Sequence, residues 1–326
     1  MDLYHWPSPE GNFGDDLNLW LWDFLLPGFR ATDTKDLLVG VGTVLDTALL
    51  PLDRRKVVVG SGTGYGKTPD VSDASLWDIR CVRGPLTAKV LGLAPDKGII
   101  DPAAIIPDMD AFQGLASQKY GTVFVPHWES ALFGRWERVC EEAGITYVDS
   151  CGDAHEVISM IAQSTLVIAE SMHAAILADA FRVPWIPVST SKQINPFKWT
   201  DWASSLELAY KPIVLPLSSP LEAGAKGQPY LGLRWPKGGS PEPMTPGAER
   251  QGRESLGGER VEGSLKSLLK SYLASSPVSG ILMKPAVYHL KKALNEAPQL
   301  SDSAVYLRQK ARFYDVIEQL KSDYCL

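Results

Sequence analysis

The sequence has no excess of positive charge and no cysteine pair at metal-binding spacing, and each absence argues against a class of function. The formal net charge is -6 and no long run of lysine or arginine occurs, so the chain has no field that would attract a nucleic acid. The 4 cysteines are scattered without a C-x-x-C pair. We therefore expect reduced structural thiols, with neither a zinc site nor a disulfide framework.

Long apolar segments are missing as well. No run of about 18 or more apolar residues indicates a membrane span. The first residues, MDLYHWPSPEGNFG, lack the basic start and apolar stretch of a secretory signal, so we expect a cytoplasmic protein. With 45% hydrophobic and 21% charged residues the composition is typical of a globular chain, and a length of 326 residues favours more than one domain.

Short apolar, β-rich runs alternate with glycine-rich turns and helical patterns in both halves of the chain. LLVGVG (37–42) is one such run in the first half, and GTVFVP (121–126) opens four strand–helix alternations in the second. This alternation is typical of parallel strands joined by crossover helices. The sequence therefore predicts an α/β fold with two Rossmann-like domains, residues 1–115 and 116–326.

The last third of the chain changes character. Residues 217–263 are rich in glycine and proline with little apolar periodicity, which predicts a loop or linker. Two amphipathic helices are expected beyond it, in 264–274 and 301–324, and the second aligns Tyr306, Phe313, Ile317 and Leu320 on one face. Both should pack onto a domain. The alternative for the first is a membrane-surface role, because lysines flank its apolar stripe.

The segment AESMHAAILADAFRVPWIPV (169–188) places Glu170, Ser171 and His173 where an apolar strand ends and a helix begins. The carboxyl ends of parallel strands face the ligand crevice, and the first N–H groups of the next helix attract anions. An imidazole there can bind a phosphate or carboxylate, or transfer a proton near neutral pH. The structural alternative is a capped helix start whose histidine only forms a nearby hydrogen bond.

Three further side chains have the chemistry to bind an anion. Arg83, in DIRCVRGPLT, precedes a Gly-Pro helix start and would direct a guanidinium toward an anion at that terminus. His127 in VPHWES follows another strand, and Lys198 in NPFKWTDW stands beside Trp199, whose ring suits a sugar. The alternatives are a solvated arginine and a tryptophan buried in the core.

Two glycine-containing turns in the first half allow a ligand to approach the backbone. GNFGDDLN places Asn12 and Asp15 at a strand-to-helix turn, where Asp15 either caps the helix or binds a sugar hydroxyl. GSGTGYG, with Gly62 and Gly64, lacks the Lys-Ser/Thr of a P-loop and the helix context of a dinucleotide fingerprint. We expect that loop to approach a substrate. DMD (108–110) is too short a signal to predict a metal site.

In this order, NFGDDLN, GSGTGYG, VRGPLTAKVLGL, VPHW, ESMHAAILADAFRVPWIPV and NPFKWTDW resemble the polysaccharide pyruvyl transferases, especially those acting on bacterial exopolysaccharides. The resemblance covers residues 12–215. It implies a two-domain fold similar to the GT-B glycosyltransferases, with phosphoenolpyruvate as donor and a sugar residue as acceptor. Pyruvate is attached as a cyclic ketal and phosphate is released. Many family members have Arg-Leu-His where this chain has Ser171-Met172-His173, which puts more weight on Arg83 and Lys198.

Within that chemistry we assign roles by residue type and expected position, with no metal and no further cofactor. The catalytic residues are His173 and Glu170, the donor-binding residues are Arg83, His127, Ser171 and Lys198, and the acceptor-binding residues are Asn12, Asp15, Gly62, Gly64 and Trp199. Lipid-linked acceptors are common in such pathways, so peripheral contact with the inner membrane face is expected. Two alternatives remain open: a GT-B glycosyltransferase using a nucleotide sugar, and a non-catalytic carbohydrate-binding protein.

Overall fold

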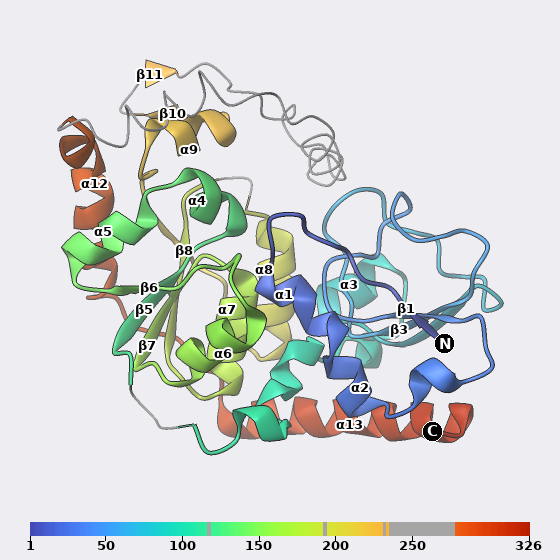
Figure 1. Cartoon of the computed structure of the whole chain (residues 1–326). Coiled ribbons are helices and arrows are strands. Elements are labelled where there is room, and N and C mark those ends of the chain that lie inside the picture. Colours follow the sequence, from blue (N-terminus) through green and yellow to red (C-terminus); the bar gives the residue numbers. More distant parts are fainter. Residues whose placement is uncertain (116–118, 192–193, 231–232, 235–277) are drawn as a thin grey trace.

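The computed structural model describes residues 1–115, 119–191, 194–230, 233–234 and 278–326, and Figure 1 shows two groups of strands with helices packed around them. The first sheet has four parallel strands in the order β1-β2-β3-β4. Their bounds are β1 Asp2–Leu3, β2 Leu37–Val39, β3 Lys56–Val59 and β4 Trp77–Cys81. The run LLVGVG contains β2, as its sequence predicts, whereas β4 was not predicted.

Short helices connect and cover this first sheet. The α-helices are α1 Phe13–Asp16, α2 Leu21–Leu25 and α3 Pro85–Val90. The 3-10 helices are η1 Leu17–Leu19, η2 Phe29–Ala31, η3 Pro95–Lys97, η4 Pro102–Asp108 and η5 Asp110–Phe112. Asn12 caps α1 by accepting a hydrogen bond from the Gly14 N–H at 3.2 Å, and Pro85 begins α3 as its sequence predicts.

The second sheet has five parallel strands in the order β6-β5-β7-β8-β9. Their bounds are β5 Thr122–Val125, β6 Thr146–Tyr147, β7 Leu166–Ala169, β8 Trp185–Ser189 and β9 Ile213–Val214. In chain order this is the doubly wound arrangement 2-1-3-4-5, so the strand order reverses between β5 and β7. The α/β class and the parallel strands of the prediction are therefore confirmed.

Six helices follow or flank these strands: α4 Trp128–Phe133, α5 Trp136–Ala143, α6 Ala154–Ala162, α7 Met172–Ala180, α8 Pro196–Ser205 and α9 Pro220–Ala225. The sequence predicts one helix over 131–144. The structure has two, α4 and α5, and α4 ends before Gly134, whose backbone is extended. A Cβ at this position would lie 2.4 Å from the Ser130 carbonyl oxygen. Glycine is therefore needed where α4 ends against its neighbours.

The segment predicted as a linker contains regular structure in its described part. Helix α9 and the antiparallel hairpin of β10 (Pro229–Tyr230) and β11 (Leu233–Arg234) lie within residues 217–234. The helix expected over 264–274 lies outside the described residues. Two later helices, α12 Val278–Ala293 and α13 Ser303–Tyr324, are described. All four residues aligned on the predicted face of α13 are buried, which confirms that helix and its packing.

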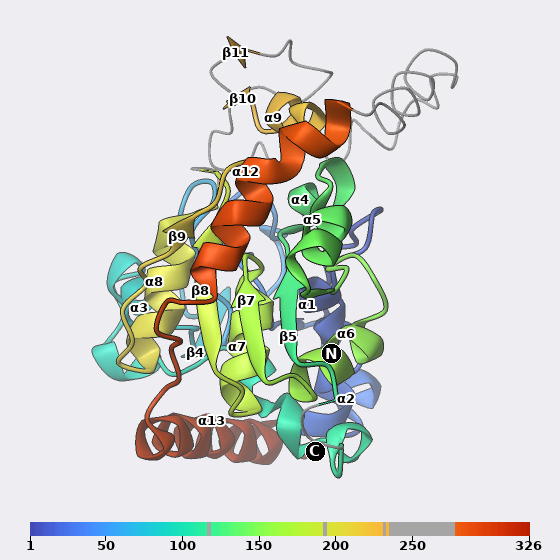
Figure 2. The same ribbon diagram turned by 90° about the vertical axis from the view of Figure 1, so that its left-hand side faces the viewer.

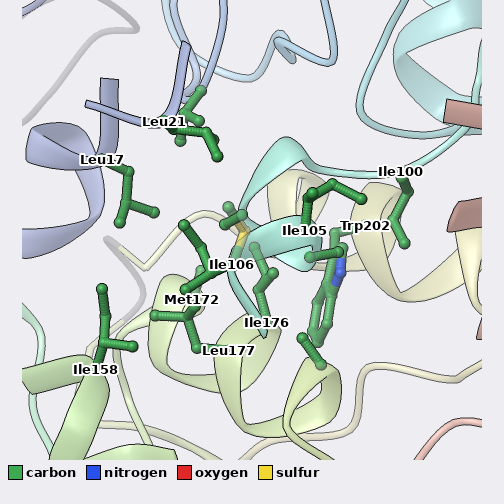
Figure 3. Close-up of a cluster of buried hydrophobic side chains, with 14 of the residues drawn as sticks. Leu17, Leu21, Ile100, Ile105, Ile106, Ile158, Met172, Ile176, Leu177 and Trp202 are labelled. Carbon is green, nitrogen blue, oxygen red and sulfur yellow. The ribbon is translucent and has the colours of Figure 1, made fainter. Parts of the chain in front are cut away.

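One hydrophobic core spans both halves of the chain. It joins residues of the first sheet and its helices to residues of β5, β7, α6 and α7. Figure 3 shows Ile105 and Ile106 of η4 beside Met172 and Ile176 of α7, with Trp202 of α8 on the same side. Because η4 comes before residue 115 and α7 after it, the proposed division at 115/116 does not separate two hydrophobic cores.

Helix α13 lies along both halves, as Figures 1 and 2 show. It contacts β4 and η4 of the first half, and its Tyr306 hydroxyl donates a hydrogen bond to the Ala104 carbonyl at 2.8 Å. On the other side, Gln309 donates to the carbonyl of Ser205 at the end of α8 at 2.9 Å. Within the described residues, no helix has the length and apolar character needed to cross a membrane.

Candidate active site

A cleft lies where the carboxyl ends of strands from both sheets meet. It has about 690 Å³ of empty volume, which includes space open to solvent. Its lining residues come from segments that follow β1, β2 and β3 of the first sheet and β5, β6, β7 and β8 of the second. The lining residues are Asn12, Asp15, Gly42, Thr43, Tyr65, His127, Trp128, Ser150, Ser171, Met172, His173 and Lys198.

The position of this cleft follows from topology. In open parallel sheets ligands bind outside the carboxyl ends of the strands, at the point where the strand order reverses. His127 follows β5 and His173 follows Ser171 and Met172 after β7, so both histidines flank the reversal in the second sheet. The six predicted residues in the lining are Asn12, Asp15, His127, Ser171, His173 and Lys198.

His173 is held between the two halves of the chain. It is 8% exposed, and its Nε2 lies 4.0 Å from Oδ2 of Asp101, a fully buried carboxylate. On the other side of the ring, a Cβ at Gly14 would come within 1.9 Å of Nδ1. The lack of a side chain at Gly14 therefore lets α1 lie against the imidazole of His173, which lines the cleft.

Burial opposes charge on both members of this pair. Desolvation raises the pKa of Asp101, against the attraction of His173 and Arg83. Desolvation also lowers the pKa of His173, against the attraction of Asp101 and Asp15, and Lys198 adds to the lowering. An imidazole with a lowered pKa is neutral at neutral pH and is a strong acid once it is protonated.

Glu170 lies behind the cleft and is fully buried. One carboxylate oxygen accepts the backbone N–H of His127 at 2.9 Å, and the other accepts the backbone N–H of Thr190 at 3.1 Å together with the Thr190 hydroxyl. The Lys226 ammonium is 3.8 Å away. Glu170 therefore holds the strand ends in place. This burial among backbone partners corrects the catalytic role expected of Glu170.

Lys226 extends this buried network into the segment predicted as a linker. Its ammonium donates to Glu222 at 2.8 Å and to the hydroxyls of Ser130 and Thr190 at 2.5 Å each. Desolvation acts to lower the pKa of Lys226, but the Glu222 and Glu170 carboxylates outweigh it and raise this pKa. Desolvation acts to raise the pKa of Glu222, but the Lys226 ammonium outweighs it and lowers this pKa. The segment that contains α9 is thus fastened to the wall of the cleft through paired charges.

Arg83 is also behind the cleft. Its side chain is fully buried and donates to Asp201 at 3.2 Å, to the Thr43 hydroxyl at 2.7 Å and to the Thr63 carbonyl at 3.1 Å. A Cβ at Gly62 would lie 2.3 Å from Cζ of Arg83, so this glycine makes room for the guanidinium. Neither Arg83 nor Gly62 lines the cleft. This burial corrects two expectations: that Arg83 contacts the donor and that Gly62 contacts the acceptor.

Lys198 and the polar residues of α1 do face the cleft. The Lys198 ammonium lies 5.1 Å from the centre of the Tyr65 ring, within cation–π range. Gly64, next to Tyr65, has φ of +153 and a carbonyl that accepts a hydrogen bond from Asn195, so it shapes this loop without lining the cleft. Across the cleft, the Asn12 amide donates to the Asp15 carboxylate at 2.8 Å.

Trp199 is a core residue. Its ring is fully buried and stacks on Tyr210 with 4.8 Å between ring centres, and it also contacts Trp185 and Trp202. A ring enclosed by protein has no face on which a sugar can stack. The expected acceptor contact of Trp199 is therefore wrong, and Trp128 and Tyr65 are the aromatic residues that line the cleft.

Sequence reasoning missed Asp101 and Ser150. Asp101 lies in an apolar run, IIDPAAII, and no nearby polar residue marks its function. The hydroxyl of Ser150 lines the cleft and is buried without a hydrogen-bond partner among the described residues. In those same residues, no group of three or more His, Cys, Asp or Glu side chains is placed to hold a metal ion.

Comparisons with known proteins show the family of the chain. The model of the polysaccharide pyruvyl transferase family matches residues 3–192, more than half of the chain, and these include every lining residue except Lys198. The chain belongs to that family and is a polysaccharide pyruvyl transferase. It is 49% identical to succinoglycan biosynthesis protein ExoV of Rhizobium meliloti (strain 1021), over 99% of this chain and 100% of that protein. No solved structure gives a significant match.

Proposed function

We propose that the protein transfers pyruvate from phosphoenolpyruvate to two hydroxyls of one sugar residue, as a cyclic ketal, in exopolysaccharide biosynthesis. The observation that carries this proposal is a cleft that combines two histidines, a lysine and the start of a helix in a member of this family. A relative named for succinoglycan biosynthesis, 49% identical over its whole length, supports the polysaccharide pathway.

The donor binds against the second sheet in this proposal. Phosphoenolpyruvate is a small trianion. Ser171, which lines the cleft, immediately precedes helix α7, and its side chain makes no capping hydrogen bond. The first N–H groups of the helix can therefore meet a phosphate or carboxylate oxygen. His127 and Lys198 supply further donors from two other elements. These groups take the place of the arginine that many family members carry at position 171.

His173 transfers the proton in the first step. Protonated at Nδ1, it gives this proton to C3 of the donor, which leaves a positive charge at C2. The first sugar hydroxyl attacks C2 and its proton returns to Nδ1. The second hydroxyl then displaces phosphate, and its proton leaves on the phosphate. One hydroxyl proton thus replaces the proton given to C3, and His173 ends the reaction in the state in which it began.

The acceptor binds against the first sheet. Asn12 and Asp15 face the donor side across the cleft and offer an amide and a carboxylate to sugar hydroxyls. Trp128 and Tyr65 supply the aromatic faces that pyranose rings contact. In this proposal residues 1–115 and 116–326 act as acceptor-side and donor-binding domains of a GT-B-like enzyme. A lipid-linked acceptor would bring it to the inner face of the cytoplasmic membrane.

Phosphate release from phosphoenolpyruvate tests this function, with a panel of lipid-linked and synthetic oligosaccharides and mass spectrometry of the sugars. A sugar that gains the mass of a pyruvate ketal is expected. His173→Ala should lower kcat by about 10²- to 10⁴-fold, the usual contribution of a general acid. His289→Ala, on α12 and outside the cleft lining, is the matched control and should retain activity.

Donor binding can be measured separately. Lys198→Gln should raise the KM for phosphoenolpyruvate by about ten- to a hundredfold, because a charge-assisted hydrogen bond contributes roughly 1.5–3 kcal/mol. Full activity of His173→Ala would refute the assigned proton transfer. No phosphate release with any acceptor, together with binding of a nucleotide sugar, would replace the proposed reaction with glycosyl transfer.

A further inference from the structure

We propose that Asp101 is the positioning residue of His173: its carboxylate accepts the Nε2 proton of the imidazole and so leaves Nδ1 as the nitrogen that exchanges protons with the substrate. This inference rests on the proposed function for its chemistry, but its structural part concerns two residues of the chain itself. Asp101 belongs to the first half and His173 to the second, so the pair joins the two sides of the cleft.

Two unsatisfied polar atoms face each other at this point. Oδ2 of Asp101 and Nε2 of His173 are both buried, and neither has a hydrogen-bond partner among the described residues. They lie 4.0 Å apart, a distance too long for a hydrogen bond. A buried polar atom without a partner is costly. Hydrogen bonds of catalytic residues are often long without substrate and shorten when it binds.

The other carboxylate oxygen of Asp101 fixes the orientation of the side chain. Oδ1 accepts the backbone N–H of Ala103 at 3.0 Å and so caps η4. Helix η4 in turn packs against α7, the helix that carries His173. The cap therefore holds Oδ2 toward the imidazole. A carboxylate with only a capping role would not need its second oxygen buried against a histidine.

Gly14 completes the geometry on the opposite side of the ring. A Cβ at this residue would lie 1.9 Å from Nδ1 and 2.5 Å from Cγ, so only glycine lets α1 lie against this edge of the ring. Nε2 thus lies beside Asp101, whereas Nδ1 is on the edge of the ring beside Gly14, in a residue that lines the cleft. This arrangement selects the tautomer with the proton on Nε2, because only that tautomer can donate to a carboxylate.

Four charged groups influence the titration of His173. Asp101 from the start of η4 and Asp15 from α1 favour the imidazolium, whereas Lys198 from α8 and Arg83 after β4 disfavour it, in addition to desolvation. Removal of the Asp101 charge should therefore lower the pKa of His173 further. A rate that requires the imidazolium should then reach half its maximum at a lower pH.

The test is Asp101→Asn, which retains an oxygen for the Ala103 N–H and so retains the cap. The new amide can donate a hydrogen bond to Nε2, which would move the imidazole proton to Nδ1. Nitrogen-15 NMR of protein labelled at histidine reports this tautomer directly and needs no substrate. We expect protonated Nε2 in the unmodified protein and protonated Nδ1 in the variant.

Kinetics provide the second measurement. We expect kcat of Asp101→Asn to fall by about 10²- to 10⁴-fold, as in other enzymes whose histidine is held in the wrong tautomer, while the KM for phosphoenolpyruvate changes less than threefold. The matched control is Asp179→Asn. Asp179 is a buried carboxylate of the same helix, α7, and accepts hydrogen bonds from Trp185 and Ser301. This control should lose stability but keep the tautomer and most of kcat.

Two results would overturn the proposal: an unchanged tautomer in Asp101→Asn, or a changed tautomer with unchanged kcat. The first would show that Asp101 only caps η4, and the second that the tautomer of His173 does not matter to turnover. Failure of the proposed function would appear differently. The NMR result would stand, but no donor and acceptor would give a pyruvylated product.

Discussion

Replacement of Arg83 by methionine separates a structural role from donor binding. The guanidinium is fully buried and makes hydrogen bonds to Asp201, Thr43 and Thr63. Methionine fills much of the same volume but leaves the Asp201 carboxylate without its cation. Breaking a buried ion pair on one side costs about 3–5 kcal/mol. For a chain of this size, each kcal/mol corresponds to roughly 2 °C in Tm, so Arg83→Met should lower Tm by about 6–10 °C.

The measurement is thermal and urea denaturation of the purified protein. The urea midpoint should fall without a change in slope if the native state stays compact. Arg30→Met is the matched control, because Arg30 pairs with Asp23 on the surface and both side chains are about half exposed. Such a pair contributes about 0–1 kcal/mol, so the control should stay close to the unmodified protein.

A double-mutant cycle sharpens the test. Arg83→Met combined with Asp201→Asn removes both charges, and the combined loss should be smaller than the sum of the two single losses by about 0.5–3 kcal/mol. An unchanged Tm in Arg83→Met, accompanied by a large rise in the KM for phosphoenolpyruvate, would refute this reasoning. Arg83 would then be a donor ligand after all.

Four further outcomes can be checked by the same methods. Gly62→Ala should destabilise the protein by about 1–3 kcal/mol in urea denaturation, because its Cβ would overlap Arg83; equal stability would contradict the close packing. Gly14→Ala should lower kcat more than tenfold through contact with Nδ1 of His173, and retained turnover would argue against that contact. Lys226→Met should cost about 3–5 kcal/mol by leaving a buried carboxylate unpaired, and a Tm unaffected by this change would show that the network adds little. Burial lowers the pKa of His173 below its usual 6.5, so below pH 6.5 the unfolded chain takes up a proton more readily than the folded protein, and folding becomes less favourable. Tm should therefore drop more steeply toward pH 5 in the unmodified protein than in His173→Gln.

Periodicity and turn chemistry predicted most of the second half of the chain. The runs at 121–126 and 165–169 form β5 and β7, and both histidines that follow them line the cleft. Such segments are predictable because buried parallel strands are continuous apolar runs and their carboxyl ends face the ligand site. The same signal is absent from β4, whose sequence WDIRC alternates polar and apolar residues and is only partly buried.

The charged residues were harder to place. Arg83, Glu170 and Lys198 have similar local contexts, near the start of a helix or the end of a strand, yet only Lys198 lines the cleft. Arg83 and Glu170 face partners that come from distant parts of the chain, Asp201 and Lys226. A local pattern does not reveal such pairing, and the sequence gives no indication that an isolated arginine is buried.

Asp101 is missed for the related reason that its partner is 72 positions away in the chain, on an element of the other half. The sequence shows only an aspartate before a proline, which is common at the start of short helices. For Trp199 the sequence predicted a substrate contact that the structure does not have. An aromatic residue beside a cation matches a sugar platform locally, but α8 directs Trp199 into the core.

The return of α13 to the first half also limits how the protein can move. Its Tyr306 is hydrogen-bonded to η4 and its Gln309 to the end of α8, so movement of one half against the other would break contacts of this helix. Because α13 packs on η4, and Asp101 caps η4 beside His173, this last helix of the chain also supports the position of the carboxylate at the active site.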